Sequence, residues 1–198
     1  IFDGKKALCY GEFETEEKAT AETETNKEEK PKAFMVKPLE DAAYIPTVII
    51  SRKPTGGGTT LEPLNLIGRK WKESFLSDGT AKVYQLTTTE LDADKVTARI
   101  MTKEGEWTEK QEGTDFTVDR KKGTVTFTTA PGASPVVGYD NVEITAAKTR
   151  KGYAEKINKC KIISLFGVNG AMERMFLSGN PDFPNRERYC KMAAGVFW

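Results

Sequence analysis

The stretch "TDFTVDRKKGTVTFTTAP", residues 114–131, decides the fold class of this chain. Phe116 and Val118 alternate with polar residues, and the same period of two returns at Val125 and Phe127. Such alternation is typical of strands that bury one face only. Gly123 stands in the short connection between the two runs, where a hairpin turn favours a left-handed backbone. The stretch therefore predicts an antiparallel β-hairpin.

Five further short strands are expected around this hairpin, between residues 71 and 149, with turns between them. Seven short strands predict an antiparallel β-sandwich of immunoglobulin-like size, although the paired Cys and central Trp of a true immunoglobulin domain are missing. Trp71 and Trp107 are expected in the core or at a strand edge. The predicted core consists of the inward-facing apolar residues Val83, Leu86, Ile100, Phe116, Val118, Val125, Phe127 and Ile144.

The regions on either side, residues 1–70 and 150–198, resemble each other in style and differ from the middle. We expect them to form two parts of one discontinuous β-sheet body, into which the sandwich 71–149 is inserted. A simple string of domains is the alternative. In the second flank, "KIISLFGV" and "RMFLSG" predict a hairpin around Asn169-Gly170, and in the first flank Asp3-Gly4 predicts another.

Residues 14–30, "ETEEKATAETETNKEEK", carry many charges and almost no large apolar side chain. This composition favours an acidic, flexible and solvated loop. A short helix is an alternative, because Glu, Lys and Ala are good helix formers. A functional acidic patch is a second alternative.

The composition restricts the partners of the chain. Its 198 residues are 38% hydrophobic and 30% charged, with a formal net charge of +1. A near-neutral chain has no global field that attracts nucleic acid, so no specific nucleic-acid partner is expected. No apolar run approaches the roughly 20 residues of a membrane span, so no membrane partner is expected either. Because the sequence starts at Ile1 without a Met, we expect a piece of a longer protein.

The residue types that usually carry chemistry are scarce. The chain contains no His, which removes the commonest general base and metal ligand. Cys9, Cys160 and Cys190 are far apart and odd in number, so neither a zinc site nor a disulfide framework is indicated. Asp115 and Asp119 would lie about 13 Å apart on an extended strand, too far for a glycosidase pair. We therefore expect no catalytic, no cofactor-binding and no metal-binding residues.

The stretch "RMFLSGNPDFPNRERYC", residues 174–190, opens as a strand and continues into two turn signals. One interpretation is architectural, because Pro restricts the residue before it to extended geometry and Pro-Asn favours a turn. The rival interpretation is a ligand rim that binds a sugar through polar side chains beside aromatic platforms. The residues of this binding rim or structural turn are Asn180, Asp182, Phe183, Asn185 and Tyr189.

Five segments, in this order, resemble tail or neck structural proteins of bacteriophages and prophages of Gram-positive bacteria. They are "TVIISRKPTGGGTTLEPLNLI", "FLSDGTAKVYQL", "EGTDFTVDRKKGTVTFTTAP", "NVEITAAKT" and "RMFLSGNPDFPNRERYC". The resemblance covers most of residues 36–190. It implies a phage β-sandwich module, and it implies that "FLSGNPDFPN" forms a blade edge of a β-propeller-like body, of which the chain would hold only a part.

The resemblance also implies a function. We expect a non-enzymatic virion structural protein that packs against other tail or neck subunits, and also self-association through exposed strand edges. It would be assembled in the bacterial host cytoplasm and remain in the virion. The alternative is a carbohydrate-binding or host-adhesion module of the same particle, with a host cell-wall glycan as its partner. A third alternative is a hydrolase that acts on the cell wall.

Overall fold

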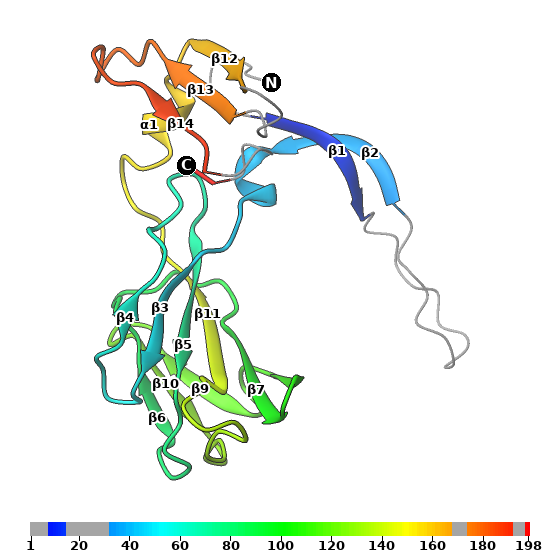
Figure 1. Cartoon of the computed structure of the whole chain (residues 1–198), viewed down its shortest axis with the longest axis vertical. Coiled ribbons are helices and arrows are strands. Elements are labelled where there is room, and N and C mark those ends of the chain that lie inside the picture. Colours follow the sequence, from blue (N-terminus) through cyan, green and yellow to red (C-terminus); the bar gives the residue numbers. More distant parts are fainter. Residues whose placement is uncertain (1–7, 15–31, 168–173, 192–196) are drawn as a thin grey trace. The chain divides into compact units, whose positions relative to one another are not determined.

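The computed structural model describes residues 8–14, 32–167, 174–191 and 197–198. The chain divides into two compact units: a larger one, Tyr44–Ala154 with Phe197, and a smaller one, Ile1–Ala43 and Glu155–Val196 with Trp198. Strands dominate both units (Figure 1). The described helices are short: the 3-10 helix η1 (Leu39–Ala42) and the α-helix α1 (Glu155–Asn158) have four residues each. The all-β prediction is therefore confirmed for the described residues.

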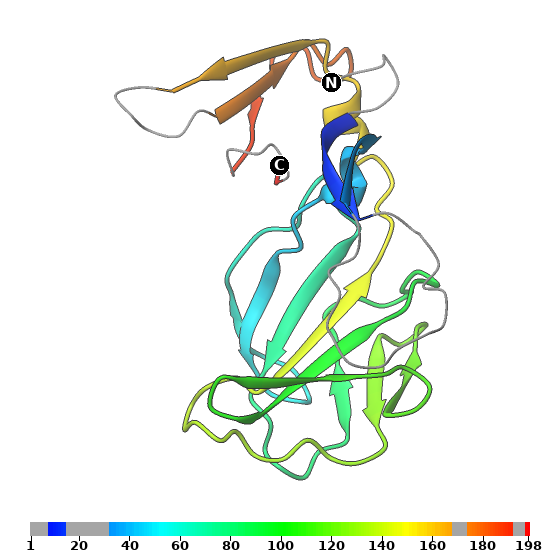
Figure 2. The ribbon, with the colours of Figure 1, turned by 90° about the vertical axis from the view of Figure 1, so that its right-hand side faces the viewer.

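A six-stranded sheet forms most of the larger unit, and its central strands lie side by side in Figure 2. The strand order is β4-β3-β5-β11-β7-β8. All neighbours are antiparallel except β3 and β5, which are parallel. The strands are β3 (Thr47–Arg52), β4 (Thr59–Thr60), β5 (Lys70–Phe75), β7 (Thr97–Lys103), β8 (Glu106–Lys110) and β11 (Val142–Ala147).

The second sheet of the larger unit has the order β6-β10-β9 and contains the predicted hairpin. Its strands are β6 (Val83–Gln85), β9 (Phe116–Asp119) and β10 (Thr124–Phe127). In the hairpin Phe116 lies opposite Phe127, as the alternation predicts. Both sheets contribute to one hydrophobic cluster. At its centre the Tyr84 ring lies 5.3 Å from that of Phe75 on β5 and 5.4 Å from that of Phe127.

The predicted core is wrong at one position. Val83 is 50% exposed, and the neighbouring Tyr84 points into the core instead. Neighbouring residues of a strand face opposite sides, so only one of the two can be buried. Tyr84 can be the buried one because its hydroxyl donates a hydrogen bond to Ser77 Oγ at 2.9 Å. Val118 is half-buried, and the other six predicted core residues are buried.

The larger unit begins at Tyr44 rather than at residue 71, the boundary expected from the sequence. Strand β3 pairs with β5, and Val48 on β3 belongs to the hydrophobic cluster. The chain then returns along β3 as β4, with Ile49 opposite Thr60. Residues 44–70 therefore belong to the central unit and not to the first flank.

A buried ion pair joins β3 to β5. Arg52 Nε lies 3.3 Å from Glu73 Oε2, and the exposed fractions of the two residues are 7% and 0%. Glu73 also accepts hydrogen bonds from Trp71 Nε1 at 3.0 Å and from the Thr87 backbone N–H. Arg52 donates to two backbone carbonyls, those of Gln85 and Gly57. Each charge is thus compensated by its partner and by further hydrogen bonds, which is what a buried ion pair requires.

The described part of the smaller unit contains two sheets. In the first, β1 (Leu8–Glu14) pairs with β2 (Lys32–Pro38) without a register shift. In the second, the order is β12 (Ile162–Phe166), β13 (Arg174–Ser178) and β14 (Arg188–Tyr189), all antiparallel. The predicted pairing of the β12 and β13 segments is confirmed. The turn expected at 169–170, the hairpin at Asp3-Gly4 and the acidic loop beyond Glu14 lie outside the described residues.

Gly123 provides a test of the hairpin. Its φ is +66°, and a Cβ at this position would lie 2.1 Å from the Thr88 carbonyl oxygen. We expect Gly123→Ala to lower the free energy of unfolding by about 3 kcal/mol or more, because backbone strain and a backbone clash add together. Gly105→Ala is the matched control, since its φ is +76° and nothing lies within 4 Å. It should cost about 1 kcal/mol. Denaturant titrations followed by Trp fluorescence measure both, and equal losses would contradict the clash.

Arg52 provides a test of the buried ion pair. Arg52→Met removes the cation and leaves the Glu73 carboxylate in the core, so we expect a loss of about 3 kcal/mol in the free energy of unfolding. Arg99→Met is the control, because the Arg99–Glu143 pair is partly exposed, with side-chain exposures of 44% and 16%. It should cost about 1 kcal/mol or less. The same denaturant titration compares them, and a loss at Arg52 no larger than that at Arg99 would show that the buried pair contributes little.

Candidate functional site

The turn after β13 contains the residues that the sequence marks as a binding rim or a structural turn. The strand ends at Ser178, and Gly179 follows with a φ of +72°, which redirects the chain. Two successive turns come next: Phe183 N–H donates to the Asn180 carbonyl at 3.0 Å, and Arg186 N–H donates to the Phe183 carbonyl at 3.1 Å. The chain then returns as β14, where Tyr189 lies opposite Phe176 of β13.

Asn180 is a structural residue of this turn. Its side chain is 1% exposed, and its Nδ2 donates to the Glu155 and Lys156 carbonyls of α1, both at 3.1 Å. Its Oδ1 accepts the backbone N–H of Asp182 at 2.9 Å, which closes a side-chain turn of the kind that Asn favours. Because both of its amide hydrogens are donated and the residue is buried, Asn180 is not accessible to a ligand.

Asp182 lies on the surface and pairs with Lys159. Lys159 Nζ donates to Asp182 Oδ2 at 2.6 Å, and this hydrogen bond raises the pKa of Lys159. The ion pair holds the turn against the end of α1 a second time.

The thiol of Cys160, next to Lys159 in the chain, is buried. Burial raises the pKa of this thiol, against a smaller opposing effect of Arg188. The thiol is therefore protonated near neutral pH, which does not favour nucleophilic chemistry.

Arginine side chains lie over the aromatic rings of the turn. The guanidinium carbons of Arg186 and Arg188 lie 5.2 and 5.7 Å from the centre of the Phe183 ring. That of Arg174 lies 5.7 Å from the centre of the Tyr189 ring. Such contacts are favourable cation–π interactions. Phe183 is half-buried, whereas Tyr189 and Asn185 are exposed, so these two and the ion-paired Asp182 are the rim residues that remain accessible to a ligand.

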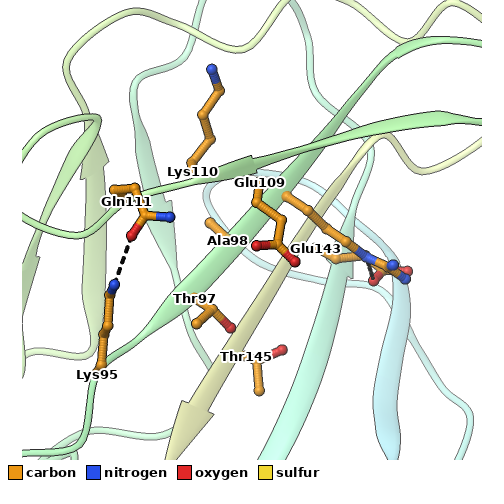
Figure 3. Close-up of a pocket in the computed structure, with 9 residues that line it drawn as sticks. Lys95, Thr97, Ala98, Glu109, Lys110, Gln111, Glu143 and Thr145 are labelled. Carbon is orange, nitrogen blue, oxygen red and sulfur yellow. Dashed lines mark hydrogen bonds and ion pairs between the residues drawn. The ribbon is translucent and has the colours of Figure 1, made fainter. Parts of the chain in front are cut away.

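A shallow polar pocket, which the sequence reasoning did not single out, lies on the outer face of the six-stranded sheet (Figure 3). Its volume is about 140 Å³, below the roughly 300–1,000 Å³ of typical ligand pockets. Arg99 Nε pairs with Glu143 Oε2 at 2.5 Å, and Lys95 Nζ donates to Gln111 Oε1 at 2.6 Å. Two of the cations that line the pocket, Lys95 and Arg99, are thus already engaged by side chains of the protein. The sequence signal that could have located this pocket is the alternation of "KVTARIM", because it places Thr97 and Arg99 on one face of a strand.

The carboxylates considered as a catalytic pair serve turns. Asp115 Oδ2 accepts the Gln111 backbone N–H at 2.7 Å, and Asp119 Oδ1 accepts that of Lys122 at 3.0 Å. Asp78 behaves in the same way: the Ala81 backbone N–H, which it accepts at 2.7 Å, lowers the pKa of its carboxyl. Carboxylates held by local backbone donors are typical of turns rather than of acid–base sites.

Comparison with known proteins found no matching family model, no matching curated protein and no matching solved structure. Within the described ranges, no group of three or more His, Cys, Asp or Glu side chains is placed to hold a metal ion. In the same part of the chain, no helix is long and apolar enough to cross a bilayer.

Asn180 and Asn185 distinguish a structural turn from a ligand rim. Asn180→Ala removes three hydrogen bonds and leaves two α1 carbonyls without that donor, so we expect the smaller unit to lose about 2 kcal/mol of stability. Asn185→Ala, in the same turn but exposed, should change stability by less than about 0.5 kcal/mol. Calorimetry of the full chain measures both. If Asn180→Ala melts like the unaltered chain, the turn does not depend on this anchor.

Proposed function

We propose that this chain is a non-enzymatic structural subunit of a bacteriophage or prophage virion, where it packs against other tail or neck subunits. It would be assembled in the cytoplasm of the bacterial host and stay in the particle. The observation that carries the proposal is the exposure of large apolar side chains in the smaller unit. Contiguous exposed apolar surface of this kind marks sites of protein–protein contact.

The β1–β2 pair shows one such surface. The register places Tyr10 opposite Val36, with Phe34 next to Val36 on the same face of the pair. All three are exposed, and the rings of Tyr10 and Phe34 stack with centres 5.7 Å apart. A two-stranded hairpin is only marginally stable in water by itself. Burial of this face against a neighbouring subunit would supply the missing stabilisation.

The larger unit supports the proposal through its fold. Two sheets that contribute to one hydrophobic cluster are consistent with the β-sandwich module that the resemblance to phage virion proteins implies. The resemblance also implies a propeller-like body. Propeller blades usually have four strands, whereas the sheet β12-β13-β14 has three. Under the proposal, the described residues therefore hold only part of a blade.

The non-enzymatic part of the proposal rests on the state of the polar groups. The acidic side chains with the clearest geometry, Glu73, Asp115 and Asp182, are engaged in ion pairs or in hydrogen bonds to the backbone. General acid–base catalysis needs a group that reaches a substrate and titrates near the working pH. Engaged carboxylates of this kind favour a structural role.

The proposed function predicts where the protein is found. Antibodies raised against the chain should label particles purified after prophage induction of the bacterium that encodes it, with the label at the tail or neck. Mass spectrometry of the same particles should detect the chain along with major virion proteins. Recovery of the chain only from the particle-free fraction would contradict a virion role.

The alternative, a carbohydrate-binding or host-adhesion module, is favoured by one observation: Tyr189 and Asn185 are exposed on the same returning segment. Titration with host cell-wall polysaccharide separates the two functions. The structural role expects no saturable binding. Saturable binding that is lost in Tyr189→Ala would support the adhesion module instead. The variants Phe183→Ala and Asn185→Ala test whether the other rim residues contribute to that binding.

A further inference from the structure

Strand β12 is exposed along its whole length. Its sequence, Ile162–Phe166, is "IISLF", and the side chains of Ile162, Ile163, Leu165 and Phe166 are 60%, 47%, 59% and 61% exposed. The register with β13 puts Ile162, Ser164 and Phe166 on one face of the sheet and Ile163 and Leu165 on the other. Both faces of this strand are therefore apolar and accessible to water.

Strand β12 is also an edge strand of its sheet as described. Alternate residues of an edge strand direct backbone N–H and C=O groups away from the sheet, where they can pair with another strand. Proteins usually prevent such pairing with charged residues, with Pro, or with very short edge strands. Strand β12 has five residues and none of these protections.

The other edge strands in the described part of the chain are all protected. Strand β8 contains Glu106, Glu109 and Lys110. Strands β4, β6 and β14 have two or three residues each. Strand β9 ends at Asp119, and the strands of the β1–β2 pair contain Glu or Lys. The same chain thus protects its other edges and leaves β12 open, which indicates that this edge has a partner.

We propose that the partner is a second copy of this chain, whose own β12 pairs antiparallel with β12 about a twofold axis at Ser164. This inference rests on the proposed function for its place in a particle, and it names one contact by which the subunits join. The paired strands would give a continuous sheet of six strands, β14-β13-β12 from each copy. A twofold contact of this kind is closed, so it produces a dimer.

The sequence of β12 matches itself in this register. Ile163 lies opposite Leu165 of the partner subunit, and Ile162 lies opposite Phe166 of the partner subunit, so every large side chain meets an apolar one. Ser164 meets its own copy at the axis, where a small side chain permits close approach. The nearest cation in the sequence, Lys161, falls opposite Gly167 of the partner subunit, so no like charges are opposed. Aromatic and β-branched cross-strand pairs are among those that stabilise sheets.

The association of the purified full chain tests this contact. Sedimentation equilibrium should show a concentration-dependent monomer–dimer equilibrium. Leu165→Lys introduces a charge into the contact and should weaken dimerisation by about tenfold or more. Val137→Lys is the control, because Val137 is 99% exposed in a loop of the larger unit, and it should leave the dimer unchanged. A monomer at all concentrations, an oligomer larger than a dimer, or a dimer insensitive to Leu165→Lys would overturn the proposal.

A cross-link tests the register. In the Cys9→Ser background, Ser164→Cys should form an intermolecular disulfide under mild oxidation, because directly opposed residues of antiparallel strands have Cα atoms about 4.5–5.5 Å apart. Thr108→Cys is the control, because Thr108 is exposed on the edge strand β8. The rate of its cross-linking should be lower by a factor of about ten or more. Equal rates would overturn the register. Failure of these tests with the chain still present in virions would reject self-pairing alone, whereas absence from virions would reject the proposed function.

Discussion

The buried ion pair between Arg52 and Glu73 is the constraint on which the larger unit depends. A charge in the core must be compensated where it lies, so the two residues fix β3 beside β5. The backbone groups of Gln85 and Thr87, at and beyond the end of β6, complete the compensation. Segments from both sheets therefore meet at one polar contact within an apolar core. This contact also explains why the larger unit includes residues that precede the alternating strands.

The sequence predicts the fold well where the hydrophobic pattern shows both that a segment is a strand and which of its two faces is buried. The β9–β10 hairpin is such a case, because four alternating apolar residues and Gly123 agree on the register. In strand β6 the sequence does not show which side chain faces the core, because the strand is short and both Val83 and Tyr84 are largely apolar. The choice depends on Ser77, which accepts the Tyr84 hydroxyl and is not recognisable as its partner in the sequence. The pairing of β3 with β5 likewise depends on partners distant in sequence.

The candidate site was likewise predictable from the sequence only in part. The turns after Ser178 were foreseeable, because Gly, Asn and Pro each restrict the backbone in a known manner. The role of Asn180 was not, since its partners are carbonyls of α1, in a segment more than twenty residues earlier in the chain. A continuous apolar run such as β12 ordinarily indicates a strand buried within its own domain. The sequence does not distinguish this case from a strand that another chain covers.

The position of β11 affects the order in which the chain becomes structured during its synthesis. It is the last strand of the larger unit, yet it lies between β5 and β7 in the six-stranded sheet. A ribosome therefore releases five strands of this sheet before it releases the one that joins them. Until residue 147 has emerged, Trp71, Phe75 and Ile100 lack their central neighbour and are candidates for chaperone binding. The sheet closes late and over a long sequence separation, which slows folding.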